Sequence, residues 1–217
     1  MDILVNGIRM YYEAEGSGPP LILLHGNGED HTIFDKAVPV LAKRFRVYTP
    51  DSRCHGKSDD PEAISYDLMA EDLTAFIRAL KLEQPVVYGF SDGGIVALLI
   101  ARMAATPVSE IIVSGANLDP KGLKWPVRME IHSVAFRKKD KLWRLMEREP
   151  HIEPASLGAI SVPVHVLAGQ HDMVKTAHTK RIAKSIPGAT LKILPGETHG
   201  SYIVHSDKLA PILLELL

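Results

Sequence analysis

Residues 85–103 read PVVYGFSDGGIVALLIARM, a stretch with few polar residues outside its centre. The run 85–88 predicts a short buried strand, and the run 95–103 predicts a helix that is apolar nearly all round. Between them, Gly89-Phe90-Ser91-Asp92-Gly93 has the pattern G-x-S-x-G. In the order strand, turn, helix, this pattern places a serine on a sharp turn with its hydroxyl exposed above a sheet. Ser91 is therefore the first candidate for a nucleophile.

Other short apolar segments predict strands on both sides of this motif, at 3–5, 8–14, 21–24, 45–48, 111–113, 162–167 and 191–194. Helical patterns at 33–41, 66–80 and 176–186 lie between them. This alternation predicts an α/β fold with a mostly parallel, eight-stranded sheet and helices on both faces. The dipeptide Asn6-Gly7 predicts an antiparallel hairpin at the N-terminal edge.

Residues 118–160 interrupt the alternation, because they have helical character and no strand pattern. We therefore expect one domain over residues 1–217, with a small helical cap inserted at 118–160. A length of 217 residues agrees with a single domain.

Composition narrows the classes of partner. The net charge is −1, which gives no reason to expect a nucleic-acid or membrane partner, and the single cysteine, Cys54, allows no internal disulfide. No stretch resembles a signal peptide or a membrane span, so we expect a cytoplasmic protein with a small-molecule substrate and a possible homodimer. The chain has no complete phosphate-binding loop, dinucleotide fingerprint or zinc spacing, so we expect no cofactor and no metal.

A serine nucleophile needs a base and a carboxylate that orients the base. In parallel sheets such groups gather beyond the carboxyl ends of the strands. Asp172 follows the strand at 162–167, and His199 follows the strand at 191–194. The order Ser91, Asp172, His199 is typical of one hydrolase architecture. Alternatives remain at this point: Asp119 and Glu197 for the carboxylate, and His171 and His205 for the base.

With these elements, the chain resembles α/β-hydrolase-fold proteins along nearly its whole length. The matching segments are the His25-Gly26 turn, the turn at 51–58, the G-x-S-x-G turn and the two later G-x-x-D and G-x-x-H segments. The resemblance implies that Ser91 is the nucleophile, His199 the general base and acid, and Asp172 the orienting carboxylate. It also implies an oxyanion hole made by the backbone N–H groups of Asn27 and Asp92. Cys54 stands where the family usually has glycine.

Asp92 is the unusual residue of the motif. The sequence Ser-Asp-Gly-Gly resembles a branch that contains aminoacyl-ester hydrolases and proline iminopeptidases. Asp92 is therefore a candidate to bind a substrate ammonium, but its place at the N-terminus of its helix favours a simpler role, in which its charge complements the helix dipole. Other candidate substrate-binding residues are Met173 and Val174 beside Asp172, and Trp125 and Met129 in the cap, where core packing is an equally good explanation.

The expected reaction is acyl transfer to water. A serine nucleophile excludes the dehalogenase and epoxide-hydrolase branches, which resemble this fold but use aspartate. We expect hydrolysis of small to medium carboxylic esters through an acyl-enzyme. The alternatives are an aminopeptidase or aminoacyl-ester hydrolase that uses Asp92, and a slow-turnover ligand receptor. A scaffold is disfavoured, because scaffolds on this fold tend to lose members of the Ser-His-Asp set.

Overall fold

The computed structural model describes all of residues 1–217 and contains one eight-stranded sheet. Its strands are β1 (Asp2–Val5), β2 (Ile8–Glu15), β3 (Pro20–Leu24), β4 (Arg46–Pro50), β5 (Val86–Phe90), β6 (Glu110–Ser114), β7 (Val164–His171) and β8 (Thr190–Thr198). Their spatial order is β1-β2-β4-β3-β5-β6-β7-β8. β2 pairs antiparallel with both β1 and β4, and every other pair is parallel. The predicted fold class is confirmed.

The helical segments connect these strands. They are η1 (His31–Phe34), α1 (Val38–Leu41), α2 (Tyr66–Ala79), α3 (Asp92–Ala101), η2 (Pro120–Gly122), α4 (Trp125–Lys138), α5 (Lys141–Arg148), η3 (Pro154–Ala159), α6 (Thr176–Ser185) and α7 (Leu209–Leu216). The helix expected over 33–41 is instead two short pieces. Pro39 lies in the first turn of α1, and a proline there prevents a helix from continuing through it, because its ring clashes with the preceding turn. None of the helices combines the length and apolar character needed to span a membrane.

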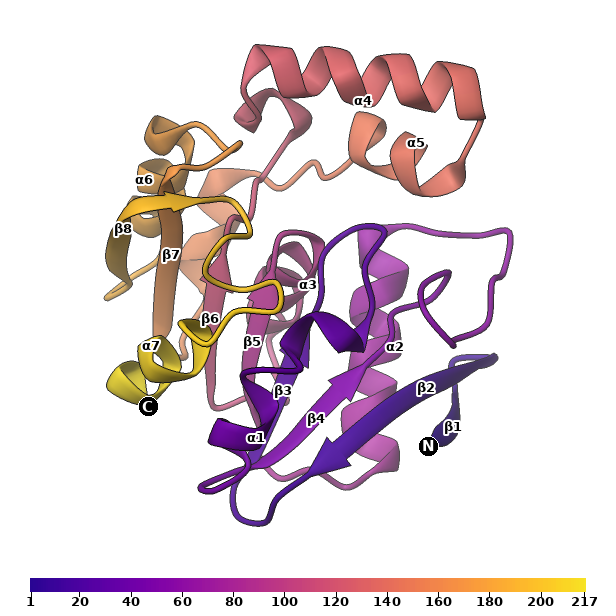
Figure 1. The fold of residues 1–217 in the computed structure, drawn as a ribbon, viewed down its shortest axis with the longest axis vertical. Helices are drawn as coiled ribbons and strands as arrows, with labels where there is room; N and C mark the ends of the chain where they lie inside the picture. The colour runs from indigo at the N-terminus through magenta and orange to yellow at the C-terminus, as the bar shows by residue number, and fades with distance from the viewer.

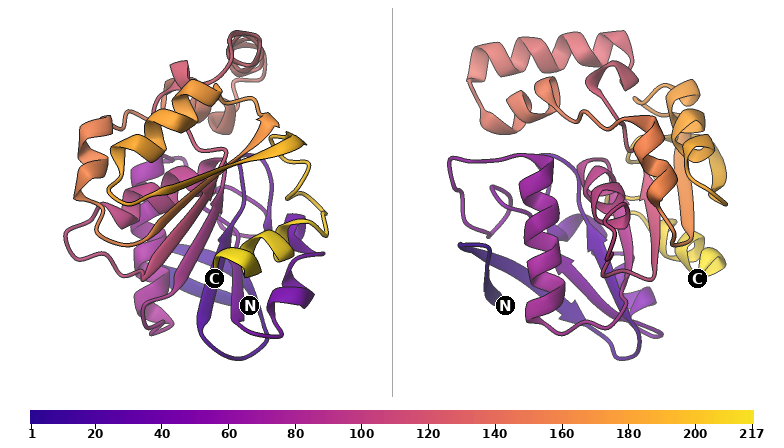
Figure 2. Two further views of the ribbon diagram at one scale, coloured as in Figure 1. Left: turned by 90° about the vertical axis from the view of Figure 1, so that its left-hand side faces the viewer. Right: turned by 180° about the vertical axis from the view of Figure 1, so that it is seen from behind.

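Helices cover both faces of the sheet (Figure 2). The larger hydrophobic cluster lies on one face, where Phe76 of α2, Leu98 of α3 and Ile182 of α6 are buried. A second cluster lies on the other face, with Leu41 of α1 and Leu213 of α7. Because α3 is buried along its whole length, the residue that begins it is held rigidly against the centre of the sheet.

The N-terminal hairpin forms at the expected dipeptide. Val5 pairs with Ile8 across the turn, and Asn6 and Gly7 have φ angles of 47° and 78°. Positive φ at both central residues matches the right-handed twist of the strands that the turn joins. This hairpin supplies the antiparallel edge of the sheet.

Residues 118–160 hold η2, α4, α5 and η3, and α4 and α5 lie above one end of the sheet (Figure 1). Ile131 of α4 is buried in a small cluster with Leu123 and Val174. This segment therefore lies across the end of the sheet where β5 leads into α3. That it acts as a separate cap stays a prediction.

Candidate active site

The turn between β5 and α3 holds Ser91 in a conformation that few residues adopt. Ser91 has φ 52° and ψ −113°, which is strained for a residue with a side chain. Its N–H donates to Ser114 O at 2.8 Å. Glycine is required on both sides: a Cβ on Gly89 would lie 2.2 Å from Gly93 O, and one on Gly93 would lie 2.5 Å from Leu24 O. The close packing of the strand against the helix thus keeps the Ser91 side chain projecting.

His199 connects Ser91 to Asp172. Its Nε2 lies 3.1 Å from Ser91 Oγ, and its Nδ1 lies 2.7 Å from Asp172 Oδ1. Asp172 is 2% exposed, and its Oδ1 also accepts the N–H of Val174 at 2.9 Å. Since an ionised carboxylate can only accept, Nδ1 carries the hydrogen and Nε2 is free to take the Ser91 proton. The structure therefore brings these three side chains together from the ends of β5, β7 and β8.

Gly115, just after β6, leaves room for the imidazole of His199. A Cβ on Gly115 would lie 2.6 Å from Cε1 and 2.8 Å from Nδ1 of that ring, and Gly115 has φ +64°. Any side chain at this position would push the ring away from Ser91. Residue 115 is therefore part of the site, although it contributes no functional group.

The loop after β3 faces the Ser91 side chain. Glu29 N–H donates to Gly26 O, and Gly26 N–H donates to Glu29 Oε2 at 2.9 Å, so the loop is closed from both sides. The Asn27 backbone N–H has no acceptor within the protein. Asp92 is the first residue of α3, where an N–H has no partner inside its helix. Two backbone donors are thus available beside Ser91, as an oxyanion hole requires.

His25 ties this loop to the turn after β4. Its Nδ1–H donates to Gly26 O at 2.8 Å, and its Nε2 accepts the N–H of Ser52 at 3.0 Å. Burial and, to a smaller extent, the neighbouring His55 lower the pKa of His25 to about 4. The ring is therefore neutral near pH 7, as a group that must accept at one nitrogen and donate at the other has to be.

The carboxylate of Asp92 is enclosed by the protein. It is 3% exposed; Oδ1 accepts the hydroxyl of Tyr66 at 2.9 Å, and Oδ2 accepts Nδ2 of Asn27 at 2.9 Å. Burial raises the pKa of Asp92, and the two hydrogen bonds oppose that rise. Its place in the first turn of α3 also lets it complement the helix N-terminus.

A cavity of about 450 Å³ lies between this loop and helices α4 and α5. Its floor includes Ser91 and His199, and its lining contains no lysine or arginine. The lining residues are Gly26, Asn27, Gly28, Glu29, Phe90, Ser91, Val127, Glu130, Ile131, Leu142, Trp143, Met146, Met173 and His199. The cavity is thus largely apolar, with carboxylates as its charged groups.

The comparison with known families follows from this geometry. Residues 19–138, more than half of the chain, match the family model described as the alpha/beta hydrolase fold. The chain belongs to the α/β hydrolase fold family.

This α/β hydrolase is similar to proteins from several organisms. It is 38% identical over 112 residues to the AB hydrolase superfamily protein YisY of Bacillus subtilis, an alignment that covers 50% of this chain and 42% of the relative. The chain thus spans less than half the length of that curated relative. It is 26% identical to the serine hydrolase BPHL of Homo sapiens, with 95% of this chain and 82% of the relative covered.

A solved structure shows the same fold over the whole chain. The esterase EaEST from Exiguobacterium antarcticum superimposes with a TM-score of 0.86 at 22% identity, and the match covers 99% of this chain and 98% of that chain. At this level of identity the likeness concerns the fold alone.

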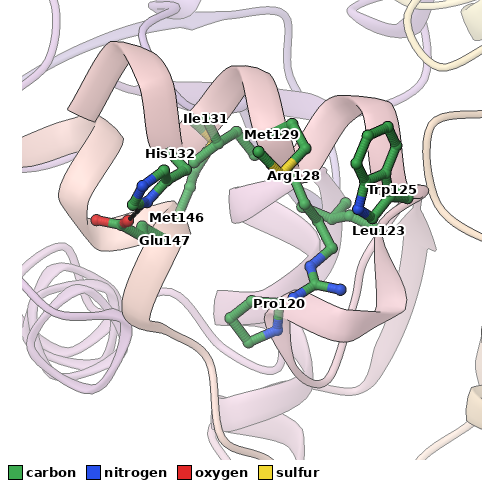
Figure 3. Close-up of a pocket in the computed structure, with 9 residues that line it drawn as sticks. All are labelled: Pro120, Leu123, Trp125, Arg128, Met129, Ile131, His132, Met146 and Glu147. Carbon is green, nitrogen blue, oxygen red and sulfur yellow. Dashed lines mark hydrogen bonds and ion pairs between the residues drawn. The ribbon is translucent and has the colours of Figure 1, made fainter. Parts of the chain in front are cut away.

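Some residues predicted to bind substrate lie elsewhere in this α/β hydrolase. Met173 lines the cavity, but Val174 is 1% exposed and packs in a core cluster. Trp125 and Met129 are 66% and 46% exposed, and they line a different pocket of about 240 Å³ with Arg128 (Figure 3). Val127, Glu130 and Ile131 are the residues of α4 that line the Ser91 cavity. A substrate-binding role for Val174, Trp125 and Met129 stays a prediction that this placement does not support.

The contacts of Asp92 do not support the prediction that it binds substrate. Both of its carboxylate oxygens are occupied by protein donors, and its side chain does not line the cavity. A substrate ammonium would have to displace Tyr66 or Asn27 from a buried site. Of the roles considered for this side chain, the structural one agrees with its contacts.

The alternative residues for the base and the carboxylate do not contact Ser91 or His199. His205 pairs with Asp35 at 3.1 Å, and Glu197 accepts from Lys208 and Ser201. Asp119 accepts the N–H of Lys121 in η2, and His171 is exposed at the end of β7.

Sequence reasoning also missed residues of the site. Trp143 of α5 lines the cavity, and Glu29 contributes a carboxyl group to it. Glu29 directly follows the Gly26-Asn27-Gly28 loop, so its closeness to the predicted oxyanion donors was a signal that could have identified it. For α5, the sequence shows only an amphipathic pattern, which does not say which surface the helix covers.

One group of side chains has the composition of a metal site. The potential ligand atoms of Asp30, His31 and Asp51 lie within 4.8 Å of one another. Asp51 already accepts from the backbone and ring of His31 and from the N–H of Lys57. These hydrogen bonds give the group a structural role in holding η1 to the turn after β4.

Proposed function

We propose that this α/β hydrolase cleaves small to medium carboxylic esters through an acyl-enzyme on Ser91. The observation that carries the proposal is the pair of contacts made by His199, at 3.1 Å to Ser91 Oγ and 2.7 Å to Asp172. Two relatives agree with it in their names, one being a serine hydrolase and the other an esterase.

In the first half of the reaction, Ser91 Oγ attacks the carbonyl carbon of the ester while His199 Nε2 takes the hydroxyl proton. The backbone N–H groups of Asn27 and Asp92 then donate to the oxyanion of the tetrahedral intermediate. As this intermediate collapses, the bond to the alcohol breaks and His199 returns the proton to the alcohol oxygen. Asp172 stabilises the imidazolium that exists between these two proton transfers.

In the second half, water replaces the alcohol. His199 takes a proton from the water, whose oxygen attacks the acyl carbon, and the same N–H groups stabilise the second oxyanion. The acid leaves when the bond to Ser91 breaks and His199 protonates Oγ. Each proton taken by His199 is thus returned, and no other co-reactant than water is needed.

The cavity supports the choice of substrate size. About 450 Å³ with apolar walls from Val127, Leu142 and Trp143 accommodates a short or medium acyl chain. The absence of lysine and arginine from the lining favours neutral or cationic esters over anionic ones.

Substitution of the nucleophile tests the proposal. We expect Ser91→Ala to lower kcat for a p-nitrophenyl ester at least about 1,000-fold and to abolish labelling by a fluorophosphonate. Ser133→Ala on the exposed side of α4 is the matched control and should leave both unchanged. Full activity in Ser91→Ala would contradict the mechanism. A burst of one equivalent followed by almost no turnover, with every ester tried, would favour a ligand receptor instead.

A further inference from the structure

Two carboxyl groups and no cationic lysine or arginine line the cavity that contains Ser91. One belongs to Glu130, which is exposed at the rim on α4. The other belongs to Glu29, which is half-buried in the loop after β3. No side chain in the lining carries a fixed positive charge to balance them. A role for these carboxyl groups in binding substrate would belong to the same site, so it rests on the proposed function.

Glu29 lies directly beside the nucleophile. The position where a Cβ would stand on Gly26 is 2.7 Å from Glu29 Oε2 and 3.1 Å from Ser91 Cβ, so the carboxyl group and the Ser91 side chain are neighbours. Oε2 accepts the Gly26 N–H at 2.9 Å. The only hydrogen bond that the Glu29 side chain accepts from the protein is this one, so Oε1 has no partner within the protein. One oxygen is thus fixed by the loop, while the other is free to contact a ligand.

In these surroundings, leaving the charged Glu29 without a binding partner at Oε1 costs free energy. Burial raises the pKa of Glu29, although the hydrogen bond from Gly26 N–H and the nearby His199 oppose this rise. Removing a carboxylate from water without a compensating charge or donor is costly. A cation that enters the cavity relieves this cost, and it does so where the ester must lie for attack by Ser91.

We infer that Glu29 is a specificity-determining residue that binds a positively charged group of the substrate, such as a protonated amine close to the scissile carbonyl. The preferred substrates are then esters whose acyl part carries both an apolar side chain and an ammonium group. Val127, Leu142 and Trp143 contact the apolar part. From the sequence, Asp92 was the candidate to bind a substrate ammonium. We place that ammonium against Glu29 instead, because Tyr66 and Asn27 already donate hydrogen bonds to the two carboxylate oxygens of Asp92.

A matched pair of substrates and one isosteric substitution test this inference. The substrates are ethyl valinate and ethyl 3-methylbutanoate, which differ only in the amino group, assayed at a pH at which the amine is protonated. The variant is Glu29→Gln, whose amide oxygen can still accept the Gly26 N–H. We expect kcat/KM for the valine ester to fall about 10- to 100-fold, the effect of losing a charge-assisted hydrogen bond, mainly through KM. The ester without the amine should change less than about threefold.

Two further variants separate recognition from structure. Glu153→Gln, an exposed carboxylate in the loop before η3, is the control for a general change in charge and should alter neither substrate. Glu29→Ala removes both the charge and the acceptor for Gly26 N–H, so it should impair both substrates. An equal loss on both esters in Glu29→Gln, or a wild-type enzyme that does not prefer the amine, would overturn the inference.

Binding measurements distinguish a failure of this inference from a failure of the proposed function. In the inactive Ser91→Ala background, ethyl valinate should bind more tightly than ethyl 3-methylbutanoate by calorimetry, and adding Glu29→Gln should remove that difference. If the difference persists in the double variant, Glu29 is not the cation site. If Ser91→Ala instead leaves turnover intact, the mechanism fails while the binding result still decides the role of Glu29.

Discussion

The hydroxyl of Tyr66 donates a hydrogen bond of 2.9 Å to Oδ1 of Asp92. This bond joins the first residue of α2 to the first residue of α3, immediately after Ser91. Burial raises the pKa of Tyr66 well above its ordinary value, so the hydroxyl keeps its proton and remains a donor. Helix α2, which carries no residue of the cavity wall, therefore helps to position Asp92 and its backbone N–H.

Tyr66→Phe should destabilise the protein by about 1–3 kcal/mol, because a buried carboxylate loses one of its two donors. Asp92 already has a raised pKa, and the substitution should raise it further. Only the ionised form of Asp92 loses a stabilising donor. The loss in stability should therefore be largest near neutral pH and should shrink as the pH falls through the pKa of Asp92. Urea unfolding at several pH values measures this effect.

Tyr48→Phe is the control for that substitution, because the Tyr48 hydroxyl makes no hydrogen bond within the protein while its ring packs beside Phe76. It should change the unfolding free energy by less than about 0.5 kcal/mol. A loss in Tyr66→Phe no greater than this would mean that the bond to Asp92 does not stabilise the fold.

His25 should make the protein sensitive to acid. Its folded pKa is about 4 and its ordinary value is 6.5, so the unfolded chain binds a proton on His25 before the folded protein does. The contribution is fully present above the ordinary value and is lost as the pH falls from about 6.5 to about 4, amounting to roughly 3 kcal/mol. His55, Asp51 and Asp30 are the charged or titratable groups that act on the ring.

The measurement is the pH dependence of the unfolding free energy of the wild type and of His25→Asn. The variant should be less stable at pH 7, because the Ser52 N–H loses its acceptor, but it should lose less stability on acidification. Parallel pH curves for the two proteins would show that His25 does not cause the acid sensitivity.

Gly115→Ala should impair catalysis far more than folding. The added Cβ would meet the His199 ring at 2.6 Å, and a displacement of about 1 Å in a reacting group costs on the order of 100-fold in rate. The positive φ of +64° adds about 1–2 kcal/mol of backbone strain for a residue with a side chain. We expect kcat to fall about 100-fold while the thermal unfolding transition remains cooperative.

Gly188→Ala separates the clash from the strain. Gly188 has φ +70°, and a Cβ there would meet nothing within 4 Å. This control should lower Tm by a similar amount and leave kcat unchanged. A similar kcat for both variants would show that His199 tolerates a methyl group at residue 115.

The strands and the three residues at their ends could be predicted because they depend on local order. Ser91, Asp172 and His199 each follow a strand of a parallel sheet, and the carboxyl ends of parallel strands share one edge. A recognisable strand pattern was therefore enough to predict that these three residues lie close together.

The cavity wall could not be predicted in the same way. Helix α4 carries apolar side chains on more than one face, with Ile131 toward Ser91 and Trp125 and Met129 toward solvent. Its rotation is fixed by packing against α5 and the segment around Val174, which hydropathy does not reveal. The burial of Asp92 depends on Tyr66 and Asn27, which are distant in the sequence.

The lack of space beside Gly115 means that a substitution at this position could reduce activity during evolution. A descendant that gained a single methyl group there would retain its serine, histidine and aspartate in an unbroken fold and still lose about 100-fold in rate. Most of the activity would then be lost with every reactive group in place, and an inspection of the reactive groups alone would classify that descendant as fully active.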